Sequence, residues 1–170
     1  MSTKITAGAA MPVMEVPRVG GGTVRLGGEG RWQMVIVYRG KHCPICKRYL
    51  GGLDALKDTI ESVGLDVVAI SGDSAEQAQA VVDEVGVTIP VGYGLSRAQM
   101  QELGLYISTP RPNETDHEFP EPGLFVVNDK GQVQIVDISN APFARPDLGA
   151  VMKGIAFIRE RDYPIRGTVA

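Results

Sequence analysis

The sequence lacks the features that mark several special classes of protein. Two cysteines in 170 residues exclude a secreted scaffold held together by disulfides. No apolar run approaches the roughly 20 residues of a membrane-spanning helix, and residues 1–11 hold no apolar core typical of a signal peptide. The 17 basic residues, against 20 acidic ones, form no block typical of nucleic-acid binding. We therefore expect a cytoplasmic protein that binds neither membrane nor nucleic acid.

The composition is that of an ordinary globular protein. Hydrophobic residues make up 44% and charged residues 22% of the chain, which argues against disorder over its whole length. The length predicts a single domain over residues 1–170. The glycine-rich stretch at 20–22 lacks the strand–turn–helix setting of a dinucleotide fingerprint, so no bound organic cofactor is expected.

Apolar patterning predicts alternating strands and helices. Runs rich in β-branched residues at 34–38 and 66–70 are typical of buried strands. A helical pattern begins at Pro44 and keeps one apolar face to Val63. Further expected elements are a loose hairpin within 12–26, helices at 74–85 and 96–104, a strand at 88–92, a loop at 109–123, strands at 124–128 and 132–138, and a helix opened by Pro146. This order predicts an α/β sandwich with a mixed sheet.

Cys43 and Cys46 are the most informative residues. They flank Pro44 and Ile45 between a buried strand and a helix start, where free N–H groups and partial positive charge favour a thiolate. Positive charge nearby comes from Arg39, Lys41, Lys47 and Arg48, and His42 can supply a proton or a hydrogen bond. A two-residue gap on a helical turn brings the sulfurs within disulfide range. The pattern predicts a dithiol/disulfide redox pair.

Plainer interpretations stay open beside this one. The two cysteines can be buried and inert, or can bind zinc together with His117 and a carboxylate, although no second cysteine pair exists to complete such a site. The basic residues can belong to an ordinary solvated face, and His42 can be a surface histidine. No metal is expected.

Two segments carry a resemblance to a known family: VIVYRGKHCPICKRYL at 35–50 and VVAISGDS at 67–74. They resemble the peroxiredoxin-like branch of the thioredoxin superfamily, the alkyl hydroperoxide reductase/thiol-specific antioxidant proteins. The resemblance covers roughly residues 8–160. It implies a thioredoxin-like sandwich with a mixed central sheet, helices on both faces and a peroxiredoxin-type insertion. It also implies a redox-active centre, and such domains commonly pair as dimers. The partly apolar stretches at 100–105 and 141–143 would allow a homodimer.

The sequence departs from the peroxiredoxin pattern Pro-x-x-x-Thr-x-x-Cys. Those three positions hold Arg39, Cys43 and Cys46, so the peroxidatic position is Cys46 and the supporting threonine is Cys43. The stretch 121–125, where the family places an arginine, has none. Arg39 or His42 would have to replace the lost groups that polarise the peroxide bond.

The same positions also resemble a thioredoxin-type site. Cys43 matches the exposed nucleophile and Cys46 the buried resolving thiol. Pro122 falls where that family carries a cis-proline facing the disulfide. Val37 stands where thioredoxins carry a buried aspartate, which removes the usual proton relay to the resolving cysteine.

Three functional hypotheses follow. The leading one is a thiol–disulfide oxidoreductase in which Cys43 attacks a substrate disulfide, Cys46 resolves the mixed disulfide, and an external thiol of thioredoxin or glutathione type restores the dithiol. The second is a peroxidase in which Cys46 forms a sulfenic acid that Cys43 resolves. The third is a non-catalytic redox sensor that presents loop 106–122, with His117 and Phe119, to a partner.

Overall fold

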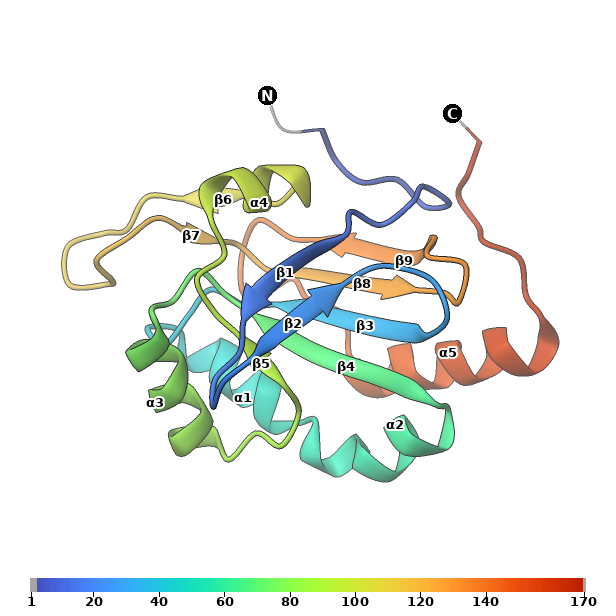
Figure 1. The fold of residues 1–170 in the computed structure, drawn as a ribbon, viewed down its shortest axis with the longest axis horizontal. Helices are drawn as coiled ribbons and strands as arrows, with labels where there is room; N and C mark the ends of the chain where they lie inside the picture. The colour runs from blue at the N-terminus through green and yellow to red at the C-terminus, as the bar shows by residue number, and fades with distance from the viewer. Residues whose placement is uncertain (1–2, 170) are drawn as a thin grey trace.

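A computed structural model describes residues 3–169, and Figure 1 shows their arrangement. A five-stranded sheet forms the centre, in the order β5-β4-β3-β8-β9. Its strands are β3 (Trp32–Val37), β4 (Leu65–Ile70), β5 (Val91–Gly92), β8 (Gly123–Val127) and β9 (Val133–Ile138). Strand β3 runs parallel to β4 and antiparallel to β8, so the sheet is mixed, as predicted.

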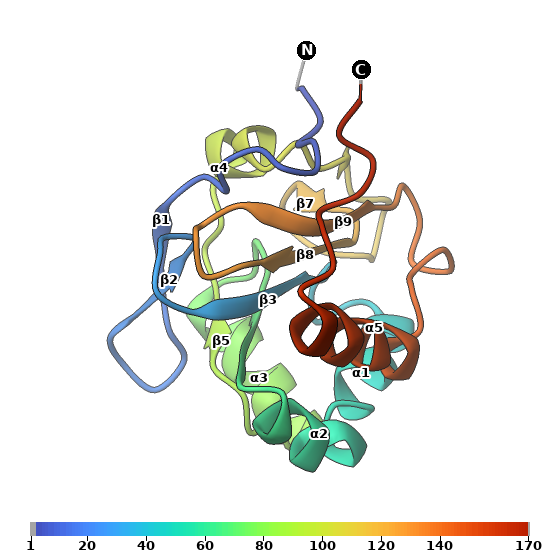
Figure 2. The same cartoon turned by 90° about the vertical axis from the view of Figure 1, so that its right-hand side faces the viewer.

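Two layers cover the faces of this sheet (Figure 2). One face carries α1 (Pro44–Gly51), α2 (Lys57–Ser62), α3 (Ala75–Val85) and α5 (Leu148–Arg161). The other carries α4 (Arg97–Glu102) and the hairpin of β1 (Met14–Pro17) and β2 (Thr23–Leu26). Alternate β3 side chains enter the two cores, Met34 and Ile36 with the four helices and Val35 with the hairpin and α4. The thioredoxin-like α/β sandwich with helices on both faces is confirmed.

The single helix expected from Pro44 to Val63 is wrong. The helix ends at Gly51, a 3₁₀ turn η1 covers Asp54–Leu56, and α2 follows from Lys57 to Ser62. The pair Gly51–Gly52 explains the break, because glycine costs about 1 kcal/mol relative to alanine inside a helix. Two weak helix formers in succession let the chain turn while the apolar face continues.

The ends of α3 and α5 are set by local caps. Ser74 and Gln77 form a reciprocal capping box at the start of α3, and Gly86 ends that helix in the left-handed conformation. Helix α5 starts later than expected, because Asp147 caps it by accepting from the Ala150 N–H. Pro146 therefore precedes the cap instead of opening the helix.

The segment between α4 and β8 is more ordered than a simple loop. Short strands β6 (Ile107–Ser108) and β7 (Phe119–Pro120) pair antiparallel, and residues 109–118 project between them (Figure 1). The stretch 100–105 does not offer the expected dimer surface, because Met100, Leu103 and Leu105 are buried in the core beneath α4. Phe143 of the other stretch is 80% exposed. Among residues 3–169, no helix is both long and apolar enough to cross a bilayer.

Candidate active site

The two cysteines lie where β3 ends and α1 begins. Cys43 is the N-cap of α1, with extended backbone angles, and Pro44 takes the first helical position, as predicted. Cys46, three residues on, donates its backbone N–H to the Cys43 sulfur at 3.3 Å. The cap role that serine or threonine oxygens usually fill is thus taken by a sulfur, and both thiols are free.

The helix start lowers the pKa of one thiol and raises that of the other. A hydrogen bond from the Cys46 thiol, with its backbone N–H and the guanidinium of Arg39, lowers the pKa of Cys43 to about 5. The same thiol contact and burial raise the pKa of Cys46. Cys43 is therefore the thiolate at neutral pH and Cys46 the proton donor that stabilises it.

Cys43 is not the exposed nucleophile that the thioredoxin resemblance implied. Only 2% of the residue is exposed, and Cys46 is fully buried. The guanidinium of Arg39 lies against the Cys43 sulfur, and Phe119, buried below it, packs on both Arg39 and His42. The interpretation of Phe119 as a residue presented to a partner is therefore wrong.

Arg39 connects the thiolate to two carboxylates. Its Nε donates to both oxygens of Glu121, at 2.8 and 3.0 Å, and its Nη2 donates to Glu114 Oε1 at 3.4 Å. Its guanidinium carbon lies 4.8 Å from the ring centroid of Phe119. Burial raises the pKa of Glu121 although Arg39 opposes that shift. Arg39 thus occupies the charged centre of the site.

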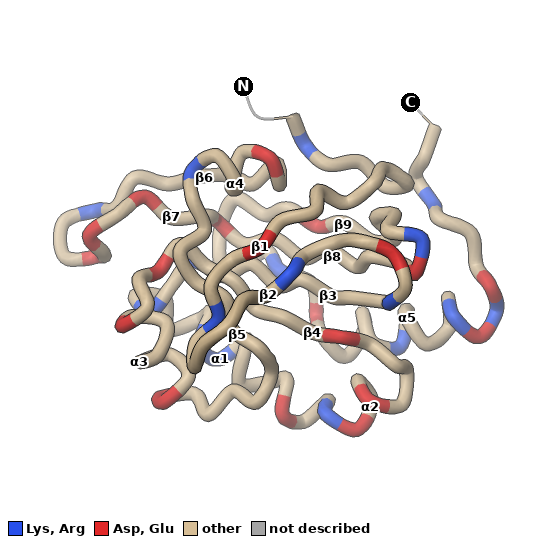
Figure 3. The backbone as a smooth tube through the Cα atoms, viewed as in Figure 1, with Lys and Arg blue, Asp and Glu red and all other residues tan. Residues whose placement is uncertain are grey.

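A tight turn at residues 111–114 covers this centre. The Glu114 N–H donates to the Arg111 carbonyl at 3.1 Å, and Asn113 takes a φ of +68°, which asparagine tolerates at the third position of a turn. Arg111 Nε donates to Glu114 Oε2 at 2.6 Å. Figure 3 shows that the projecting loop carries charges of both signs.

His42 is buried beneath that turn. Its side chain is 6% exposed, and its ring centroid lies 4.4 Å from that of Phe119. Burial, followed by the charge of Arg39, lowers the pKa of His42, so the ring is neutral at pH 7. Neither ring nitrogen has a hydrogen-bond partner within residues 3–169. His42 shapes the pocket and is not a surface histidine.

Asp73, after β4, fixes the backbone that leads into Cys43. Its Oδ2 accepts the Lys41 N–H at 2.8 Å, and its Oδ1 lies 3.7 Å from His117 Nε2. Burial raises the pKa of Asp73. His117 therefore contacts Asp73 and, at 2.8 Å, Asp116, instead of joining the cysteines. Among residues 3–169, no three His, Cys, Asp or Glu side chains cluster to hold a metal.

The Gly40→Ala substitution should destabilise the protein by about 2 kcal/mol, because Gly40 has a φ of +139° and an added Cβ would lie 2.5 Å from Asp73 Oδ1. Urea unfolding measures this. Gly154→Ala is the matched control, since Gly154 lies in α5 with open space around its Cβ position. That control should gain about 0.5–1 kcal/mol from helix propensity. Equal effects at the two sites would refute the steric argument.

The cis-proline expected at position 122 is absent, because every peptide bond in the described part of the chain is trans. Pro122 is buried just before β8, and its carbonyl accepts the Ser139 N–H at 2.9 Å. Glu121 donates its N–H to the Tyr106 carbonyl at 2.8 Å. With a trans bond before Pro122, both of these backbone hydrogen bonds form and the Glu121 side chain contacts Arg39.

Lys47 does not contribute to the site as expected. It forms an ion pair with Glu84 of α3 at 3.0 Å.

Arg145, in the loop before α5, is a charged residue that the sequence did not suggest. Its guanidinium carbon lies 4.5 Å from the ring centroid of Tyr49, one helical turn beyond Cys46 on α1. Its charge lowers the pKa of Cys46 against the larger opposing contributions. Its Nε donates to the Pro142 carbonyl at 3.1 Å. The charge of Arg145 thus acts on Cys46 from the loop before α5, whereas the sequence suggested positive charge only from residues 39–48.

Comparison with known proteins now decides the family. The model of the AhpC/TSA family matches residues 7–136, which is most of the chain. The chain belongs to the AhpC/TSA family. It is therefore a thiol-dependent oxidoreductase. No curated protein matches it at comparable significance.

Solved structures agree on the fold of this AhpC/TSA chain. A peroxiredoxin-like protein from Aquifex aeolicus is 16% identical, with a TM-score of 0.77 over 92% of this chain and 89% of that one. Peroxiredoxin 6 of Arenicola marina is 16% identical, with a TM-score of 0.75 over 94% of this chain and 76% of that one. The peroxidoxin BcpB of Mycobacterium tuberculosis is 16% identical, with a TM-score of 0.70 over 94% and 99%.

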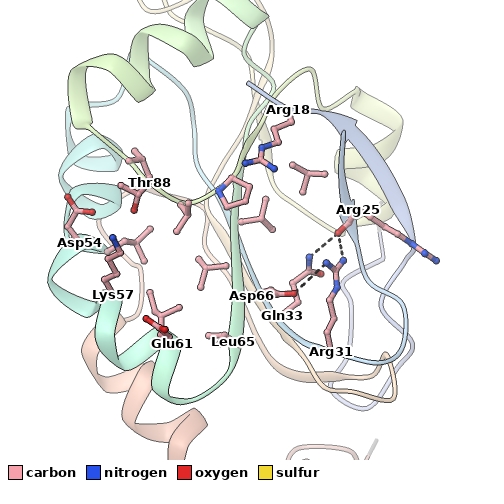
Figure 4. A pocket seen from close by; sticks show the side chains of 18 of the residues that line it. Arg18, Arg25, Arg31, Gln33, Asp54, Lys57, Glu61, Leu65, Asp66 and Thr88 are labelled. Atoms are coloured by element: carbon pink, nitrogen blue, oxygen red, sulfur yellow. Dashed lines mark hydrogen bonds and ion pairs between the residues drawn. The ribbon is translucent and has the colours of Figure 1, made fainter. Parts of the chain in front are cut away.

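A depression of about 610 Å³ lies away from the cysteines. It is lined by residues of β4, of α2 and of the β1–β2 hairpin (Figure 4). Asp54, Lys57 and Glu61 stand on the helix side, and Arg18 and Arg31 on the hairpin side. None of the predicted site residues lines it. The predicted redox residues lie instead at the start of α1.

Proposed function

We propose that this AhpC/TSA chain is a dithiol oxidoreductase in which Cys43 is the attacking thiolate and Cys46 the resolving thiol. The observation that supports this assignment is the capping geometry. The Cys43 sulfur sits at the positive end of α1, accepts the Cys46 N–H and contacts Arg39, whereas Cys46 is deeper and keeps its proton. An attacking group needs the lower pKa, and a resolving group is best kept protonated until it is needed.

The leading reaction is exchange with a substrate disulfide. The Cys43 thiolate attacks one sulfur, and the other sulfur leaves as a thiolate that takes a proton. Cys46 then loses its proton and attacks the Cys43 sulfur, which forms the Cys43–Cys46 bond and releases the second substrate thiol. Each turn oxidises the protein by two electrons and reduces one disulfide. An external thiol reductant of thioredoxin or glutathione type then reduces the Cys43–Cys46 disulfide back to two thiols.

The second candidate is a peroxidase reaction at the same thiolate. The burial of Cys43 supports it, because a hydroperoxide reaches a sulfur that is 2% exposed more easily than a protein disulfide does. The thiolate attacks one oxygen, the O–O bond breaks, and the leaving oxygen departs as water or an alcohol after protonation. The resulting sulfenic acid condenses with Cys46 and loses water. This assignment exchanges the two cysteines relative to the peroxiredoxin alignment, which places attack at Cys46.

The Cys46→Ser variant should separate these reactions, because it removes the resolving thiol and leaves Cys43 to react. With a small disulfide, the variant should accumulate a mixed disulfide at Cys43. With hydrogen peroxide, it should stop at a sulfenic acid that dimedone labels on Cys43. Peptide mass spectrometry reads both products, and stopped-flow measurement of thiol loss in the reduced wild type shows which oxidant reacts faster.

Cys43→Ser is the matched control, and it should form neither product at the remaining cysteine. Adducts on Cys46 in that variant, formed as fast as adducts on Cys43, would refute the proposed order of attack. Normal turnover by Cys46→Ser would refute the dithiol cycle. Slow reaction of the wild type with both oxidants would favour a redox sensor. The expected homodimer stays a prediction, for which the exposed Phe143 is the first residue to change.

A further inference from the structure

The carboxylate of Glu114 lies among cationic and ring nitrogens from two separate parts of the fold. Arg111 Nε, on the same turn, donates to Oε2 at 2.6 Å. Arg39 Nη2, at the end of β3, donates to Oε1 at 3.4 Å, and His42 Nε2 lies 3.7 Å from the same oxygen. Arg111 is the chief cause of the lowered pKa of Glu114, so the group is an anion at neutral pH.

The anion belongs to the covering turn and not to the core of the site. Glu114 is part of the loop that projects between β6 and β7, whereas Arg39 and His42 are anchored beside the N-terminus of α1. A depression of about 510 Å³ is lined by His42 and by the turn residues 111–114. Glu114 thus lines this depression and contacts Arg39, which in turn contacts the Cys43 sulfur. Arg111, with 84% of its side chain exposed, also lines the depression.

Arg39 and Arg111 differ in the carboxylates with which they pair. Arg39 is held by both oxygens of Glu121 through its Nε, which leaves Nη2 with the single longer contact to Glu114. Arg111 has Glu114 as its ion-pair partner. If the Glu114 side chain swings out, Nη2 of Arg39 and the guanidinium of Arg111 both lose that carboxylate, and Arg39 stays beside the Cys43 sulfur. Guanidinium groups are well suited to bind another carboxylate in its place.

We propose that Glu114 occupies the place of a substrate carboxylate, and that the preferred oxidant of Cys43 is a small molecule that carries a carboxylate. Its anionic group replaces the Glu114 carboxylate between Arg39 and Arg111 when the Glu114 side chain swings out, and its reactive atom then faces the Cys43 sulfur. The substrate carboxylate makes no covalent bond. The sulfur chemistry is that of the proposed function, on which the identity of the oxidant rests, whereas recognition of the anion does not depend on it.

Two alkylating reagents of nearly equal size test the recognition directly. Iodoacetate carries a carboxylate and iodoacetamide a neutral amide, and each forms a carbon–sulfur bond with the Cys43 thiolate and releases iodide. The measurement is the ratio of the two rate constants at Cys43 in the reduced full-length protein, with the site assigned by peptide mass spectrometry. Free cysteine at the same pH and salt is the reference, and the ratio for Cys43 should exceed it.

Glu114→Gln should raise the iodoacetate-to-iodoacetamide ratio by about fivefold at low salt, as expected for one partly exposed ion pair. Arg111→Gln should lower the ratio by a similar factor, and added salt should weaken both effects. Arg97→Gln is the matched control. Arg97 is exposed and pairs at 3.4 Å with Glu118 of the same loop, so its loss changes the charge but not the Glu114 site, and the ratio should hold.

The proposal is overturned if Glu114→Gln speeds both reagents equally, because Glu114 is then a steric cover alone. It is also overturned if the Glu114 and Arg111 variants change the ratio no more than Arg97→Gln does. A redox comparison uses glutathione disulfide, which carries carboxylates, and bis(2-hydroxyethyl) disulfide, which is neutral. If neither oxidises the protein while the alkylation ratios behave as expected, the disulfide reaction fails and the anion site stands.

Discussion

At pH 7 the reduced protein should carry one stable thiolate, which absorbs near 240 nm and is lost on acidification with a midpoint at about pH 5. An ordinary cysteine with a pKa near 8.5 is only about 3% ionised at pH 7, so the thiolate fraction at Cys43 is roughly 30-fold higher. The cause is local, because the Cys46 thiol and N–H and the Arg39 guanidinium all stabilise the anion.

The Cys43→Ser variant should lose this absorbance change entirely below pH 8. Cys46→Ser should keep a thiolate with a low midpoint, since the serine hydroxyl can replace the thiol donor and the backbone N–H remains. The pH midpoint is a better readout than the absolute rate of alkylation, because the nucleophilicity of a thiolate falls as its pKa falls. A titration in which Cys46 gives the midpoint near 5 would contradict the assignment of the attacking thiol.

The same titration affects stability, with a defined sign. The folded pKa of Cys43 lies below that of the unfolded chain, so between about pH 5 and 8.5 the unfolded state binds more protons there. The free energy of unfolding of the reduced protein should therefore rise with pH across that window. The contribution of Cys43 is fully present above about pH 8.5 and is lost as the pH falls to about 5, because below that pH both states carry the proton. The oxidised protein, in which neither sulfur titrates, should lack this contribution.

Local chemistry explains why part of the site could be predicted from the sequence. The buried strand, the proline at the first helical position and the two-residue gap place Cys43 and Cys46 on the first turn of α1 without reference to the rest of the chain. The same reasoning placed Arg39 beside the sulfurs. Signals of this kind span only a few residues, which is why the helix at 74–85 and the strands at 124–128 and 132–138 could also be predicted.

The rest of the site depends on contacts that no local pattern encodes. Arg39 meets Glu121 and Glu114 across 82 and 75 residues of chain. Asp73 lies in the segment 67–74, which carries the family resemblance. Its contact with the Lys41 N–H nevertheless depends on β4 lying beside β3. Burial of Cys43 depends in the same way on Arg39 and on the segment between β6 and β7. Sequence identified the reactive atoms, and the fold determined their access.

The departures from the peroxiredoxin pattern form a consistent set once the contacts are known. With a sulfur at position 43 in place of a hydroxyl, the cap itself becomes a nucleophile. The arginine missing from residues 121–125 is matched by Arg39 on the Cys43 side and Arg145 on the Cys46 side. Glu121, in the stretch that lacks the arginine, holds Arg39 in place. Each cysteine thus has an arginine whose charge lowers its pKa, Arg39 for Cys43 and Arg145 for Cys46.

Arg39→Met should both destabilise the protein and raise the pKa of Cys43, and a second substitution should separate the two effects. Loss of Arg39 leaves the carboxylate of Glu121, whose side chain is 4% exposed, without its partner, which costs about 3 kcal/mol for a largely buried pair. The Arg39→Met/Glu121→Leu double variant removes that buried charge. Its stability should return to within about 1 kcal/mol of wild type, as replacement of a buried ion pair by apolar groups allows.

The thiolate should not recover with the stability. In both variants that lack Arg39, the midpoint of the 240 nm titration should lie above the wild-type value of about 5, because the guanidinium that lowers the pKa of Cys43 is gone. Glu121→Leu alone should shift the midpoint in the opposite direction, since a nearby negative charge is removed while Arg39 stays beside Glu114. A double variant that regains both stability and the low midpoint would show that Arg39 acts only through folding. Recovery of stability alone would show that its charge acts on the sulfur directly.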